Sequence, residues 1–216
     1  MPTLAVMLIW INGPFGGGKT QTAHELVRRT PGAVLCDPEL VGFGLHRMTP
    51  PELRGDFQDF PGWRRGVREV LELALTRHGG PVFAPMTVVD PDYLAEILDP
   101  LREKGHEVHH FALLAQRAEV VRRLRERGFG HVVQKITGRE APLWRESWAV
   151  SKLDLCLERL ARPEFGTQVW TDGLTVPEVA DRIGAAVGLS LLPNTDGELR
   201  GALRRAWVGV RHIRFD

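Results

Sequence analysis

The sequence predicts an α/β fold: a five-stranded parallel sheet covered by helices on both faces. Apolar runs of strand length alternate with longer stretches of helical periodicity, which is the pattern of βαβ units. The length of 216 residues suits one such domain. A hydrophobic fraction of 43% and a charged fraction of 25% are ordinary values for a globular protein, so a disordered or fibrous chain is not indicated.

Strands and helices alternate along most of the chain. Strands are expected at residues 6–11, 33–36, 82–85, 108–114 and 168–171. Helices are expected at residues 19–29, 62–78, 91–104, 118–127, 143–160 and 176–187. The third helix has the clearest start, because Asp90 is a good N-cap residue and Pro91 then occupies the first helical position.

A glycine-rich segment joins the first predicted strand to the first predicted helix. It consists of Gly13, Pro14, Phe15, Gly16, Gly17, Gly18, Lys19 and Thr20. Its pattern of Gly, four residues and Gly-Lys-Thr is that of the P-loop, in which backbone N–H groups surround phosphate oxygens. Lys19 is expected to contact the β- and γ-phosphates and Thr20 to bind Mg²⁺. The strand before the segment and the helix after it provide the context that this motif requires, so we expect ATP or GTP with Mg²⁺ as cofactors.

Charge and cysteine content argue against a nucleic-acid-binding protein, a disulfide-rich protein and a zinc protein. The formal net charge of +1 gives no reason to expect a nucleic-acid partner. The two cysteines, Cys36 and Cys156, are far apart and lack the spacing of a disulfide framework or a zinc site. The apolar start of the chain lacks a basic n-region and a small-residue cleavage site and reads as a strand. A cytoplasmic protein is therefore expected.

Acidic residues that follow predicted strands are candidates for the catalytic base. Ligands of open parallel sheets bind beyond the carboxyl ends of the strands, and Asp37 and Asp90 follow the second and third of them. Asp37 is the favoured base for accepting the proton of an attacking hydroxyl, with a turn or N-cap role as the alternative. Asp90 is explained by its N-cap position alone. Both are further candidate ligands for Mg²⁺.

Arginines and glycines crowd into a predicted lid at about residues 122–150. Positive charge above the transferring phosphoryl group stabilises it, and Arg123 and Arg127 are our candidates because they are four residues apart on one helical face. The alternative is a solvated charged face. Arg127 and Asp172, the latter directly after the fifth predicted strand, are also candidate nucleotide contacts.

The last part of the chain is expected to be separate from the domain at residues 1–192. A dense turn signal begins at Pro193, and the tail at 193–216 then places apolar residues at helical spacing between arginines: Leu199, Leu203, Trp207 and Val210 against Arg200, Arg204, Arg205, Arg211 and Arg214. This pattern predicts a basic amphipathic helix. It could lie on an anionic membrane surface or dock on the domain.

Several short runs carry information beyond the P-loop. They read IWINGPFG at 9–16, DPE at 37–39, VGF at 41–43, DFQDFP at 56–61, PMTVV at 85–89, HHF at 109–111 and VRHIR at 210–214. Together these runs resemble the tunicamycin-resistance ATP-binding proteins of bacteria. The resemblance extends from the glycine loop to the tail, but the segment from Gly128 to Arg145 contains more glycine and arginine than that family leads us to expect.

The resemblance implies an ATP-binding protein that protects a bacterium against tunicamycin, a lipid-linked uridine nucleoside. It implies the fold of shikimate and nucleoside monophosphate kinases, with a lid, and peripheral membrane association through the C-terminal helix. Antibiotic kinases of that broader group also resemble this chain, and they carry a base where Asp37 stands.

Two functions remain open at this point. The first is a kinase that moves the γ-phosphate of ATP to a hydroxyl of tunicamycin or a related nucleoside antibiotic. The second is a binding protein that captures the drug in an ATP-dependent closed state without chemistry. A regulatory GTPase is disfavoured, because the sequence contains no Asn-Lys-x-Asp guanine motif.

Overall fold

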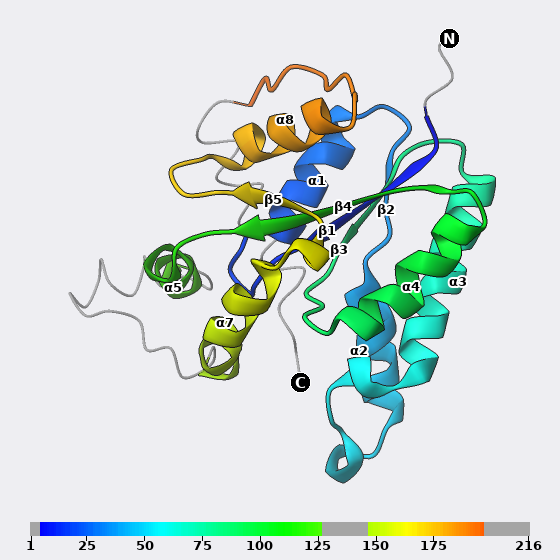
Figure 1. The fold of residues 1–216 in the computed structure, drawn as a ribbon, viewed down its shortest axis with the longest axis vertical. Coiled ribbons are helices and arrows are strands. Elements are labelled where there is room, and N and C mark those ends of the chain that lie inside the picture. Colours follow the sequence, from blue (N-terminus) through cyan, green and yellow to red (C-terminus); the bar gives the residue numbers. More distant parts are fainter. Residues whose placement is uncertain (1–4, 127–146, 197–216) are drawn as a thin grey trace.

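The computed structural model describes residues 5–126 and 147–196. Its sheet has five strands in the order β2-β3-β1-β4-β5, and every neighbouring pair is parallel (Figure 1). The strands are β1 Met7–Asn12, β2 Val34–Leu35, β3 Val82–Pro85, β4 Glu107–Leu114 and β5 Thr167–Trp170. The predicted five-stranded parallel sheet is confirmed.

Helices connect the strands and cover both faces of the sheet (Figure 1). They are α1 Lys19–Arg29, α2 Pro38–Met48, α3 Pro61–Arg77, α4 Pro91–Glu103, α5 Arg117–Glu126, α7 Ser147–Leu160 and α8 Val176–Ala186. Short 3₁₀ turns occupy Pro51–Leu53, Phe57–Asp59 and Pro163–Phe165. The predicted helices are present within a few residues, although most of the predicted lid and residues 197–216 of the predicted tail lie outside the described residues.

Strand β1 runs through the middle of the sheet and is buried along its whole length. Its side chains alternate, so that Leu8 and Trp10 join the core beneath α3 and α4 while Ile9 and Ile11 join the core beneath α1 and α8. Successive residues of a strand point to opposite faces, which explains why one apolar run serves both cores. The loop that follows β1 is therefore held at a fixed position.

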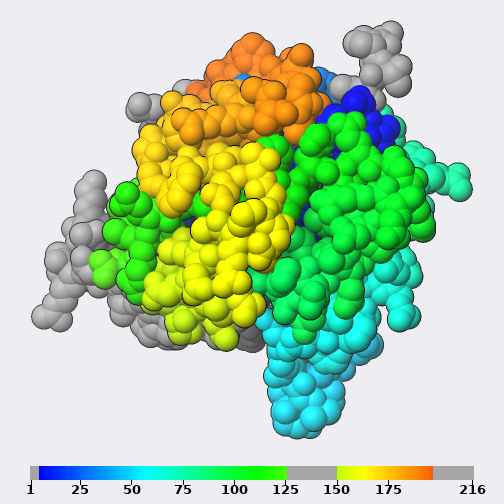
Figure 2. Space-filling model, in the orientation of Figure 1, coloured from blue at the N-terminus to red at the C-terminus, as the bar shows by residue number. Residues whose placement is uncertain are grey.

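Helix α2 was not expected from the sequence. It begins with Asp37 as N-cap and Pro38 at the first helical position, the same start signal that correctly predicted α4. Its two glycines weaken the helical propensity. Gly42 is required by packing, because a Cβ there would lie 2.6 Å from the Phe57 ring. In the space-filling view the chain that follows α2 projects from the body of the molecule (Figure 2).

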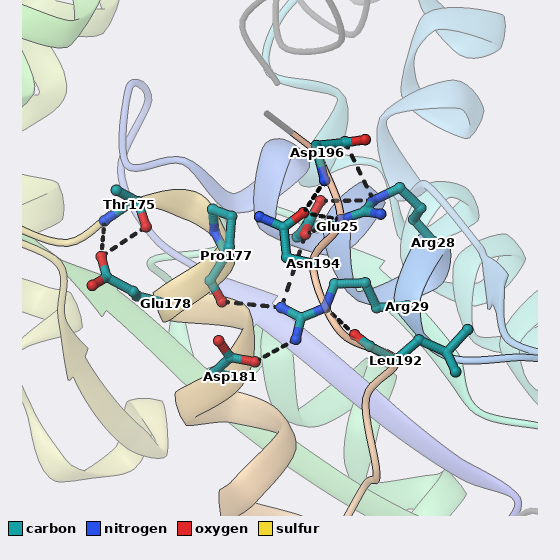
Figure 3. Close-up of polar contacts among 10 residues, drawn as sticks. All are labelled: Glu25, Arg28, Arg29, Thr175, Pro177, Glu178, Asp181, Leu192, Asn194 and Asp196. Atoms are coloured by element: carbon teal, nitrogen blue, oxygen red, sulfur yellow. Dashed lines mark hydrogen bonds and ion pairs between the residues drawn. The ribbon is translucent and has the colours of Figure 1, made fainter. Parts of the chain in front are cut away.

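The last described residues, 189–196, form a strap that returns over the end of α1. Arg29 is only 5% exposed and holds this strap, since its guanidinium donates to the carbonyl oxygens of Leu192 at 2.7 Å and Pro177 at 3.4 Å. It also pairs with Asp181 at 2.6 Å (Figure 3). Arg28 donates to Asn194 at 2.8 Å, so residues 193–196, predicted to begin a separate tail, lie against the domain.

We predict that Arg29→Ala lowers the free energy of unfolding by about 1–3 kcal/mol, because the part-buried hydrogen bonds to the carbonyl oxygens of Pro177 and Leu192 and the ion pair with Asp181 are lost. Urea denaturation measures this change. The matched control is Arg102→Ala, because Arg102 and Asp99 form an ion pair in which the side chains are 43% and 54% exposed. That variant should change stability by less than about 0.5 kcal/mol. An equal loss in both variants would contradict the role given to the strap.

Candidate functional site

The glycine loop between β1 and α1 is shaped by positions that only glycine fits. Gly16 has φ 77° and Gly18 has φ 89°, both in the left-handed region. A Cβ at Gly16 would lie 2.9 Å from the side chain of Leu124 on α5. A Cβ at Gly18 would meet no described atom within 4 Å, so the loop opens to space at this point. The loop packs against α5 on one side and is open on the other.

The start of α1 suits a bound anion. No described side chain caps it, and its first turn contains no acidic residue. Backbone N–H groups at a helix start attract phosphate, since they lack intrahelical partners. Lys19 is 7% exposed, and its Nζ donates to the Pro14 carbonyl at 3.1 Å and lies 5.5 Å from the Phe15 ring centroid. The ammonium group is thus held over the loop, where a triphosphate would bind, and half-buried Thr20 follows directly.

Asn12 fastens this loop to the segment after β3. Its side chain is fully buried. The amide oxygen accepts from Gly13 N at 2.9 Å and from Val88 N at 3.1 Å, and the amide nitrogen donates to Val88 O at 2.7 Å. Thr87 adds a hydrogen bond from its hydroxyl to Gly13 O at 2.8 Å. The first glycine of the loop is therefore fixed by two side chains.

A pocket lies beside the glycine loop, next to the segment that follows β3. Its lining comes from the loop, from the 3₁₀ turn at 56–59, from the segment after β3, and from α4 and α7: Phe15, Asp56, Gln58, Asp59, Thr87, Val89, Asp90, Tyr93, Lys152, Leu155, Cys156 and Arg159. Phe15 and Thr87 belong to both the loop region and the pocket. The two sites are therefore neighbours that share part of their walls.

One wall of the pocket is acidic and hydrogen-bonded. Tyr93 donates its hydroxyl to Asp59 at 3.0 Å, which raises the pKa of Tyr93. Gln58 donates to the Thr87 carbonyl at 3.1 Å. Arg64, 7% exposed, lies beneath this wall: it donates to Gln58 O, pairs with Glu96 at 2.6 Å and stacks 4.1 Å from the Tyr93 ring. This wall is rigidly built.

The part of the lining that comes from α7 is basic. Lys152, Cys156 and Arg159 lie on one face of α7 and all line the pocket. Burial raises the pKa of the Cys156 thiol, and the positive charges of Lys19, Lys152 and Arg159 act in the opposite direction. Arg159 also donates to the Val89 carbonyl at 3.3 Å. Positive charge from α7 and from the loop lysine therefore converges on this side.

The aspartates proposed as catalytic bases both cap helices. Asp37 accepts from Glu39 N at 3.0 Å, and Asp90 accepts from Asp92 N at 2.9 Å and Tyr93 N at 3.2 Å. Each uses one carboxylate oxygen for the bonds described. Asp90 lines the pocket, whereas Asp37 is not among its described lining residues. Whether either is the base, or binds Mg²⁺, stays a prediction.

The predicted lid and nucleotide contacts have mixed outcomes. Arg123 is anchored, because its guanidinium donates to Glu119 at 2.8 Å, to the Thr171 hydroxyl at 3.0 Å and to the Thr171 carbonyl at 2.9 Å. Arg122 and Arg123 lower the pKa of Glu119 to about 2.

Asp172 accepts from Gln116 N at 3.0 Å and so joins the end of β5 to the start of α5. Arg127 lies outside the described residues. Phosphate contacts from these residues stay predictions.

The residues that sequence reasoning missed lie on the pocket walls. Asp59 and Tyr93 come together only through folding, and Lys152 and Arg159 carried no local signal. The run at 56–61 was noticed for its family resemblance, which was the available pointer to this wall.

Comparison with known proteins agrees with this geometry. A family model described as an AAA domain matches residues 8–140. The structure of the Deinococcus radiodurans tunicamycin resistance protein matches with 35% identity and a TM-score of 0.68, over 87% of this chain and 98% of that one. The chain belongs to this family of P-loop proteins. No significant match is found among curated proteins.

More distant structures confirm the fold of this family. The Mycobacterium tuberculosis APS kinase in complex with AMPPNP and APS has 16% identity and a TM-score of 0.58, covering 87% of this chain and 99% of that one. The Bacteroides thetaiotaomicron shikimate kinase has 17% identity and a TM-score of 0.52, covering 85% and 99%. The family thus has the fold of small-molecule P-loop kinases, as the sequence predicted.

No group of three or more His, Cys, Asp or Glu side chains suited to a metal occurs within residues 5–126 and 147–196. In P-loop proteins Mg²⁺ is bound by the nucleotide phosphates and by the Ser or Thr that follows the lysine, and Thr20 in this role stays a prediction.

We predict that Thr87→Val weakens nucleotide binding by up to about fivefold, because a loop without the hydrogen bond to Gly13 O must be ordered when the nucleotide binds, and that bond contributes at most about 1 kcal/mol. The two side chains have nearly the same shape, so the fold should persist. Titration with a fluorescent ATP analogue measures the affinity. Thr76→Val removes a comparable hydroxyl–carbonyl bond at an exposed position of α3 and should leave the affinity unchanged. Equal affinities of Thr87→Val and wild type would refute the locking role.

Proposed function

We propose that this protein confers tunicamycin resistance as an ATP-dependent small-molecule kinase. The observation that carries the proposal is the polar pocket directly beside the glycine loop, because a kinase must hold its acceptor within reach of the γ-phosphate. The 35% identical relative supports the drug as the ligand, since that protein is described as a tunicamycin resistance protein.

In the proposed reaction a hydroxyl oxygen of the drug attacks the γ-phosphorus of ATP. The bond from that phosphorus to the β–γ bridging oxygen breaks, and ADP leaves. The hydroxyl proton passes to a carboxylate, for which Asp37 remains our first candidate and pocket-lining Asp90 the second. Lys19 and the α1 N-terminus stabilise the phosphate charge, and Mg²⁺ bound with Thr20 would neutralise the β- and γ-oxygens.

Asp37 follows a strand at the same carboxyl end of the parallel sheet as the glycine loop, and this supports it as a candidate base. It follows β2, two strands away from β1, which puts it roughly 10 Å across the sheet edge from the loop. The Pro38 carbonyl accepts from the buried Trp63 indole at 3.1 Å, so the backbone here is fixed.

The second candidate function is drug capture without chemistry. It is favoured by the capping role of Asp37 and by the absence of this side chain from the described pocket lining. A protein that only binds needs no base, and ATP would then serve to close the site around the drug.

We predict that Asp37→Asn reduces phosphate transfer by about 10²–10⁴-fold with little change in drug affinity if Asp37 is the base. Asn is as good an N-cap as Asp, so α2 should keep its start. Mass spectrometry of tunicamycin incubated with protein and Mg-ATP measures transfer, and calorimetry measures binding.

The paired variant is Asp90→Asn, which also preserves its cap, and Lys19→Ala is the inactive reference. Loss of transfer in Asp90→Asn alone would move the base to Asp90. No transfer by the wild type, with tight ATP-dependent drug binding, would replace the kinase by capture.

We also propose peripheral association with an anionic membrane at its cytoplasmic face through the tail at 193–216. No helix in the described ranges is long and apolar enough to cross a membrane. Each arginine near an anionic surface contributes roughly 1 kcal/mol to binding.

We predict that truncation after Asp196, which spares the strap, abolishes flotation with phosphatidylserine-containing liposomes but leaves nucleotide affinity intact. Flotation equal to that of the full chain would argue for a tail without membrane contact.

A further inference from the structure

The two walls of the pocket beside the glycine loop differ in the hydrogen bonds that they can make. The carboxylates of Asp56, Asp59 and Asp90 can only accept hydrogen bonds. The side chains of Lys152 and Arg159 can only donate them. A ligand between these walls must donate on one side and accept on the other. A hydroxyl group does both, since it has one donor and two acceptor lone pairs.

Net charge argues against a strongly charged ligand part. A phosphate or carboxylate would be attracted to Lys152 and Arg159 but repelled by the three aspartates of the lining. An ammonium group would meet the converse problem beside Lys152 and Arg159. A neutral group with several hydroxyls satisfies both walls without an unpaired charge.

The acidic wall is held in place before any ligand binds. Asp59 accepts from Tyr93, the Tyr93 ring stacks on Arg64, and Arg64 is fixed by Glu96 and the Gln58 carbonyl. Preorganised acceptors lose little entropy on binding and so contribute more to affinity.

We infer that this pocket takes a neutral, polyhydroxylated, sugar-like part of the acceptor, held between Asp59 on one wall and Lys152 and Arg159 on the other. This inference rests on the proposed function, because only a kinase requires a ligand hydroxyl to point towards the γ-phosphate. The sugar hydroxyls would donate to Asp59 and accept from Lys152. One of them would then point towards the glycine loop and Phe15, which is one of the two residues that the pocket shares with the loop region.

The test uses three sugars of one shape and different charge: glucose, glucosamine and glucose 6-phosphate, with N-acetylglucosamine as a second neutral ligand. Saturation-transfer NMR on the full chain with a non-hydrolysable Mg-ATP analogue measures binding. The two neutral sugars should bind at least tenfold more tightly than the charged ones. Absence of binding by both neutral sugars, or preference for a charged one, overturns the inference.

Variants locate the binding. Asp59→Asn and Lys152→Met should each weaken the neutral sugars by about tenfold or more, whereas Tyr93→Phe should weaken them less, because Asp59 keeps its charge. The matched control Asp99→Asn alters an exposed carboxylate on α4 that is paired with Arg102, and it should have no effect. Equal binding in wild type, Asp59→Asn and Lys152→Met would refute this pocket as the site.

The inference and the proposed function fail separately. If sugar binding depends on Asp59 but the wild type transfers no phosphate to tunicamycin, the kinase function is wrong and the pocket chemistry stands. If phosphate is transferred but neither neutral sugar binds, the kinase function stands and the sugar-like ligand is wrong. ATP-analogue affinity, measured in every variant, should stay at the wild-type value.

Discussion

The buried amide of Asn12 is the interaction on which the site depends. Asn12 is the last residue of β1 and is fully buried. A buried amide that lacks hydrogen-bond partners would destabilise the protein. All of the bonds described for it go to backbone atoms, one in the glycine loop and two at Val88. One amide thus links the glycine loop to the segment that lines the neighbouring pocket.

The rest of the pocket is assembled around that fixed pair of segments. The acidic wall is built from below by Arg64, whose buried charge is matched by Glu96 and by a backbone carbonyl. The basic wall depends on α7, which packs with α5 in a small apolar cluster that includes Leu124 and Leu153. Because Gly16 of the loop also touches Leu124, a movement of α5 would reach the nucleotide loop and the basic wall together.

The sequence was sufficient for the sheet, the P-loop and most helices, because these features have local signals: apolar runs, a glycine motif and caps. It was insufficient for α2, where glycines obscured a helix whose start signal was nevertheless present at Asp37 and Pro38. It was also insufficient for the pocket. Asp59, Tyr93 and Lys152 come from three distant parts of the chain, and only the packing of α3, α4 and α7 brings them to one cavity. Arg123 shows the converse case: its helical position was predicted, but its partners at Thr171 depend on tertiary structure.

The strap held by Arg29 determines where anything attached to it begins. Helix α1 starts at the glycine loop, and its 11 residues are about 16 Å long. At its far end Arg29 binds the Leu192 carbonyl. The last described residue, Asp196, lies 4.0 Å from Arg28 and so stays at this end of α1. Changes made to the strap therefore act on the end of α1 that lies farthest from the glycine loop.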